Sequence, residues 1–70
     1  MGSLGSLTAR ELEIASFTAR GFAEKEIASE LSISPHTVRV HIENIKRRLA
    51  AKNKTHAIAI LLTATLIKID

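Results

Sequence analysis

The sequence of 70 residues lacks cysteine, tryptophan and tyrosine, and its aromatic residues are two phenylalanines. Without cysteine there can be no disulfide and no thiolate-ligated metal, so no covalent staple can stabilise this short chain. The three histidines, His36, His41 and His56, do not have the spacing that puts two ligands on one helix face, and we expect no metal site. Stability must come from helix packing or from association with a second copy.

Long apolar runs are also missing. The longest, residues 57–67, is interrupted by Thr63 and Thr65 and is much shorter than the about 20 residues that cross a bilayer. No nucleophile, base and orienting group cluster in the sequence, and so small a domain has little room for a substrate pocket. We therefore expect no membrane association, no enzymatic activity and no cofactor.

The first six residues, Met-Gly-Ser-Leu-Gly-Ser, are small and uncharged. They predict a flexible linker or a remnant of cloning, which leaves residues 7–70 as one domain.

Positive charge is concentrated in one segment of the chain. Residues 1–35 carry three basic and five acidic side chains, whereas residues 36–56 carry six basic side chains and Glu43 as the single acidic one. Such a segment is typical of a surface that meets phosphates. Taken alone, it fits a solvated helix face equally well.

Capping signals predict an all-α fold of four helices. The Thr8–Glu11 capping box starts a helix over residues 9–20, which Gly21 ends. A second helix covers 24–31, although Ala23 before it is a poor cap. Ser34 caps a third helix, 35–50, in which proline takes the first position.

A fourth helix is predicted after the polar connector 52–54, from a Thr55 cap to about residue 67. Its apolar side chains surround most of its circumference. Because one side of a surface helix stays uncovered, the spare apolar surface predicts self-association. The residues expected at this interface are Ile58, Leu62, Thr65 and Leu66.

Helices 24–31 and 35–50, joined by the three-residue turn 32–34, form a helix-turn-helix. In the second of them, Val38, Ile42, Ile45 and Leu49 recur at intervals of four, three and four, as in a core-facing stripe. The opposite side and its flanks carry His36, Arg39, Val40, Glu43, Lys46 and Arg47. Arg39 can read a guanine, Val40 a thymine methyl and Glu43 a cytosine amine, while Lys46, Arg47 and Arg48 lie where the helix meets phosphates.

The sequence resembles the LuxR-type helix-turn-helix domain over residues 7–62, without gaps. The resemblance is carried by Leu7-Thr8-Ala9-Arg10-Glu11-Leu12-Glu13-Ile14, Gly21, Lys25-Glu26-Ile27-Ala28, Leu31-Ser32-Ile33-Ser34, Thr37-Val38-Arg39-Val40-His41, Asn44-Ile45 and Leu49. It implies a sequence-specific DNA-binding domain of a bacterial transcription regulator, in the cytoplasm at the nucleoid. In larger members this is the C-terminal output domain, linked to a phosphoacceptor receiver or to an acyl-homoserine lactone sensor.

The resemblance also assigns roles to individual residues. It puts Arg39, Val40 and Glu43 at bases and Lys25, Thr37 and Lys46 at the DNA backbone, and it makes the fourth helix the dimerisation element. To these sets we add His36 as a base contact, and Ser34 and Arg47 as phosphate contacts. The expected partners are an inverted-repeat operator in double-stranded DNA, a second copy of the chain and RNA polymerase.

Three residues depart from the family pattern. Ala23 replaces a serine or threonine cap, Ser32 stands where glycine is common, and Glu43 stands where a basic residue is frequent. A left-handed turn at Ser32 would be mildly strained. Two alternatives remain open: a sigma-factor-like promoter reader, and a helical adaptor that docks through its fourth helix.

Overall fold

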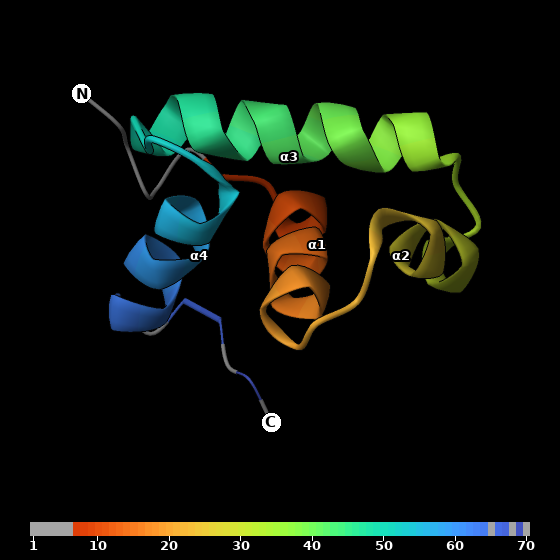
Figure 1. Ribbon diagram of the computed structural model, residues 1–70, viewed down its shortest axis with the longest axis horizontal. Helices are drawn as coiled ribbons and strands as arrows, with labels where there is room; N and C mark the ends of the chain where they lie inside the picture. Colours follow the sequence, from red (N-terminus) through yellow and green to blue (C-terminus); the bar gives the residue numbers. More distant parts are fainter. Residues whose placement is uncertain (1–6, 65, 68, 70) are drawn as a thin grey trace.

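A computed structural model describes residues 7–64, 66, 67 and 69. Within this part the chain is all-helical, as predicted, with α1 at Ala9–Ala19, α2 at Glu24–Leu31, α3 at Pro35–Leu49 and α4 at Lys54–Thr63. Figure 1 shows α3 lying along one side of the bundle, with α1 between α2 and α4 beneath it. The expected linker, residues 1–6, lies outside the described residues.

Side-chain caps start three of the four helices. The Thr8 hydroxyl accepts from the Glu11 amide at 3.1 Å, and the Glu11 carboxylate accepts from the Thr8 amide at 3.0 Å, which confirms the capping box. Ser34 accepts from the Thr37 amide at 3.0 Å and precedes Pro35 at the start of α3. At α2 the cap is half formed, because Ala23 has no acceptor and only its own amide is satisfied, by Glu26 at 2.8 Å.

The fourth helix differs from its prediction at both ends. Asn53, not Thr55, is the N-cap and accepts from the His56 amide at 2.8 Å. The helix ends at Thr63, and the Leu66 amide donates to the Leu61 carbonyl at 3.0 Å as the chain turns back. Ile67 thus returns to the core, where it is buried. Part of the apolar excess that predicted self-association is therefore satisfied within the domain.

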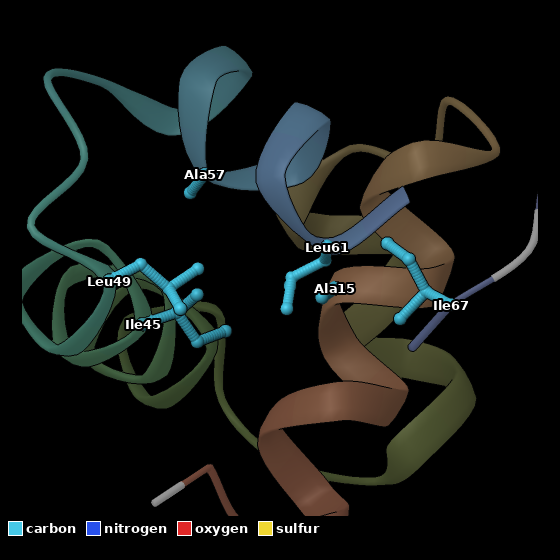
Figure 2. Packing of buried hydrophobic residues seen from close by; sticks show 6 residues of the cluster. All are labelled: Ala15, Ile45, Leu49, Ala57, Leu61 and Ile67. Atoms are coloured by element: carbon cyan, nitrogen blue, oxygen red, sulfur yellow. The ribbon is translucent and has the colours of Figure 1, made fainter. Parts of the chain in front are cut away.

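Two clusters of buried residues divide the predicted stripe of α3 between them. Val38 and Ile42 pack in a cluster with α1 and α2, while Ile45 and Leu49 pack in a cluster with α1 and α4. Figure 2 shows the second cluster, in which Leu49 and Ile45 face Leu61 of α4, with Ala15 of α1 beside it. The whole stripe is buried, as predicted, so α1 anchors α3 along its length, with α2 at its first half and α4 at its second half.

The turn of the helix-turn-helix has the left-handed backbone anticipated at Ser32, with φ 56° and ψ 43°. The Ile33 amide donates to the Ala28 carbonyl at 3.0 Å and closes the end of α2. Ile33 is half-buried and packs on the cluster between α1, α2 and α3. Serine, unlike glycine, has a Cβ atom that makes this left-handed conformation unfavourable.

Ser32→Gly is expected to raise the free energy of unfolding by about 0.5–1 kcal/mol, since it relieves this backbone strain. The gain is partly offset by the greater freedom of glycine in the unfolded chain. Urea denaturation measures the difference. Gly21→Ala is the reverse control: at φ 93° with no atom near an added Cβ, it should destabilise through the backbone alone. If the two variants changed the free energy of unfolding in the same direction, the explanation would be contradicted.

No helix in the described part of the chain is long and apolar enough to cross a membrane.

Candidate nucleic-acid interface

The outer face of α3 is free of other elements in the part of the chain that the structure describes. Along it His36, Arg39, Val40, Glu43 and Arg47 are all exposed. Val40 is 44% exposed, so an aliphatic side chain lies uncovered among these polar groups. An exposed helix face that combines long hydrogen-bonding side chains with one aliphatic group fits the edges of bases in a major groove.

Two of the predicted base contacts form ion pairs within the domain. Arg39 donates from Nε and Nη2 to Oε1 of Glu24, at 3.3 and 3.1 Å, and so links α3 to α2. Glu43 pairs with Lys46 one turn along α3, at 2.8 Å. Both pairs lie at the surface and keep opposite charges close together on the outer face of α3.

The side chains predicted to contact phosphates differ in their exposure and in whether they form hydrogen bonds within the domain. Lys25 is exposed at the first turn of α2. The hydroxyls of Ser34 and Thr37 lie 2.9 Å apart and share a hydrogen bond at the start of α3. Arg47 donates from Nη2 to the Asn44 side chain at 2.7 Å and remains exposed. These groups flank the outer face of α3 near its beginning and its end.

Arg48, which was expected to meet phosphates together with Lys46 and Arg47, forms an ion pair within the domain. Its guanidinium donates from Nη1 to Oε1 of Glu11 at 2.6 Å. Glu11 is 3% exposed and comes from α1. Because Arg48 is on the flank of α3 that turns toward α1, its charge is bound to a buried carboxylate and serves the packing of the two helices.

His41 is half-buried, and its Nδ1 is buried without a hydrogen-bond partner among the described residues. Among the described residues, no group of three or more histidine, aspartate or glutamate side chains could hold a metal ion.

The predicted dimer contacts fall into three groups. Ile58 and Leu62 are half-buried and pack partly on the core. Leu66 is 41% exposed but lies beyond the end of α4, and Thr65 lies outside the described residues. Beside Ile58 and Leu62 lie two small exposed residues, Ala59 and Thr63. Ala59 borders two shallow apolar depressions, one of which Ile58 and Leu62 also line and the other Thr63.

Glu24 has a place on this face that no expectation from the sequence gave it. As an acidic residue in the first turn of α2, it is also a favourable charge at the N-terminus of that helix. The contact with Arg39 joins residues 15 positions apart, and no local pattern marks such a pair. The acidic first turn of α2 beside the predicted reading helix was the available signal.

Comparisons with known proteins agree with this geometry. Residues 5–61 match the family described as bacterial regulatory proteins, luxR family. The chain is 43% identical over 56 residues to the nitrate/nitrite response regulator protein NarP and 46% identical over 52 residues to the transcriptional regulatory protein UhpA, both of Escherichia coli. It is 43% identical over 56 residues to the transcriptional activator protein SolR of Ralstonia nicotianae.

These matches cover 80%, 74% and 80% of this chain but only 26%, 26% and 24% of the respective relatives. The chain thus spans about a quarter of the length of the regulators that it matches. With the matched family extending over most of its residues and all four helices in place, the chain belongs to the luxR family of bacterial regulatory proteins, as a transcription regulator's helix-turn-helix DNA-binding domain.

Proposed function

We propose that this domain binds double-stranded DNA in a sequence-specific manner, with α3 in the major groove and two copies on an inverted repeat. The observation that carries the proposal is the uncovered outer face of α3, where Arg39 and Val40 lie in the first half of the helix and Glu43 lies just past its middle. Recognition helices typically read bases with their N-terminal residues. The burial of the opposite stripe supports this orientation, because it fixes which face can approach DNA.

Two sets of residues on and beside the outer face of α3 contact different parts of the DNA. Arg39, Val40 and Glu43, with His36 beside them, contact base edges. The groups that contact phosphates are Lys25, Ser34, Thr37, Lys46 and Arg47. Three of these are cations. The salt slope, which is the slope of the logarithm of the binding constant against the logarithm of the salt concentration, is therefore predicted to be about −2.7 for a single protomer and about twice that value for a dimer.

Titration of the domain with a duplex of random sequence, at about 50 and about 200 mM salt, tests the proposal. We expect binding that weakens steeply with salt and a further gain in affinity on duplexes selected from a random pool. An adaptor that docks through α4 would bind neither duplex, even at low salt. That result would overturn the proposed function.

Lys46→Ala is expected to weaken binding to all duplexes and to flatten the salt slope by about one unit. Base preference should stay unchanged, because a phosphate contact carries no sequence information. Arg10→Ala is a closely matched control: Arg10 pairs with Glu13 three residues along α1, as Lys46 pairs with Glu43 three residues earlier on α3. Both substitutions remove one positive charge, but the proposal requires that Lys46→Ala flattens the salt slope and that Arg10→Ala leaves it unchanged.

For the dimer, α4 supplies the two-fold contact, centred on Ala59 with Ile58, Leu62 and Leu66 around it. Thr65 is kept as part of this proposed interface. A single short helix in each subunit buries little area, so the free domain associates weakly. DNA strengthens the pairing, because two half-sites about one helical turn apart hold the copies at high effective concentration.

Ala59→Glu is expected to abolish cooperative binding to a duplex with two half-sites and to leave one-to-one binding to a single half-site intact. The charge enters an exposed position, so the core is untouched, whereas a charge at half-buried Leu62 would also disturb packing. Analytical ultracentrifugation with the duplex gives the stoichiometry, and circular dichroism checks helicity. Cooperative two-to-one binding by Ala59→Glu would exclude α4 as the interface.

Because the chain spans about a quarter of the regulators it matches, we propose that it acts as the output part of a longer protein. A receiver or signal-binding domain on its N-terminal side would control dimerisation, and contact with RNA polymerase would follow binding to the operator.

A further inference from the structure

Resting on the proposed function, we propose that Glu24 is a positioning residue that fixes the guanidinium of Arg39 for reading a single base pair. The ion pair crosses from the first residue of α2 to the middle of the first half of α3. Glu24 would thereby contribute to sequence discrimination from outside the recognition helix, and without touching DNA.

The first support is the geometry of the guanidinium fork. Nε and Nη2 of Arg39 both donate to one oxygen, Oε1 of Glu24. This contact occupies the side edge of the guanidinium and leaves one Nη1 hydrogen and the second Nη2 hydrogen side by side at its end edge. Two such donors on one edge match the O6 and N7 acceptors of guanine. The carboxylate therefore holds the fork in an orientation that leaves a bidentate edge available.

The second support is the difference in exposure between the partners. The Arg39 side chain is 62% exposed and the Glu24 side chain 29%. Glu24 is thus the more firmly held partner, on a helix packed through buried Ile27 and Ala28. An arginine with many accessible rotamers loses entropy when it binds a base. A partner that already restricts it reduces that loss, provided that the restricted orientation suits the base.

The third support is electrostatic. A carboxylate on a DNA-binding face repels phosphates, so Glu24 lowers binding to DNA of any sequence. It also keeps Arg39 from serving as a general phosphate contact. The ion pair thus lowers affinity for DNA of any sequence and raises discrimination between sequences. Removal of Glu24 should therefore raise affinity for unrelated DNA and lower discrimination.

The test uses a duplex selected by the unaltered domain from a random pool, its single-base-pair variants and a scrambled duplex. With Glu24→Gln we expect discrimination at one base pair to fall by about threefold to tenfold, a part of what a bidentate contact provides. Affinity for the scrambled duplex should rise, and its salt slope should steepen by about 0.9 as Arg39 becomes free to meet a phosphate. Arg39→Ala should lose discrimination at the same base pair.

Glu26→Gln is the matched control. Glu26 is in the same first turn of α2 and carries the same charge, but its carboxylate accepts from the Ala23 amide. Discrimination at the Arg39 base pair should therefore stay at the level of the unaltered domain. In the Arg39→Ala background, Glu24→Gln should cause no further loss of discrimination.

Two results would overturn the inference while leaving the proposed function intact. One is full discrimination by Glu24→Gln at every base pair. The other is equal weakening on all duplexes, which would assign Glu24 a structural role in α2. Failure of the unaltered domain to select any sequence would instead overturn the proposed function, and the inference with it.

Discussion

Val40→Glu is expected to weaken binding to every duplex by about 100-fold, equivalent to about 3 kcal/mol, because like charges brought together at an interface cost several kcal/mol. Val40 lies on the outer face of α3 next to Arg39. A carboxylate there would be carried into the groove between two lines of phosphates and would lose its water. Fluorescence anisotropy with a labelled duplex measures the change.

The substitution should leave the domain folded. Val40 is 44% exposed and contributes little to the core, and glutamate is a better helix former than valine. We expect the free energy of unfolding to change by less than about 0.5 kcal/mol. Ala9→Glu, which adds the same charge at an exposed position on α1, controls for net charge. Binding by Val40→Glu within threefold of that control would mean that α3 does not enter the groove.

Arg48→Met is expected to lower the free energy of unfolding by about 3 kcal/mol, since it leaves the carboxylate of Glu11 buried without its cationic partner. For a domain of 70 residues, total stability is about 4–10 kcal/mol, so the loss is a large fraction of the whole. Urea denaturation followed by circular dichroism gives the value. The DNA salt slope, measured where the variant is folded, should not change.

The double variant Glu11→Gln with Arg48→Met separates the two roles of Glu11. The amide oxygen of glutamine can still accept from the Thr8 amide and keep the cap, and no charge remains buried. We therefore expect the double variant to be more stable than Arg48→Met alone. Arg48→Met within 0.5 kcal/mol of the unaltered domain would show that the pair contributes little. A salt slope flattened by about one unit would restore Arg48 to the phosphate contacts.

Much of the fold could be predicted from the sequence because its signals are local. The capping box at Thr8 and Glu11, the Ser34 cap with Pro35, and the stripe of α3 each depend on residues within a few positions of one another. Hydrogen bonds and side-chain periodicity of that range are fixed once a helix forms. The end of α4 was predicted wrongly because an apolar run does not say whether the helix continues or the chain turns back to bury Ile67.

The candidate site likewise has features that local sequence signals predict and features that depend on contacts between distant residues. By itself the sequence determined the third helix, its buried and exposed faces, and the family. Tertiary structure alone decided which partners the cations of that helix have: Arg48 is paired with Glu11, 37 positions away, and Arg39 with Glu24, 15 positions away. The partner of a long cationic side chain depends on how α1 and α2 cross α3, and the packing of the whole core sets that crossing.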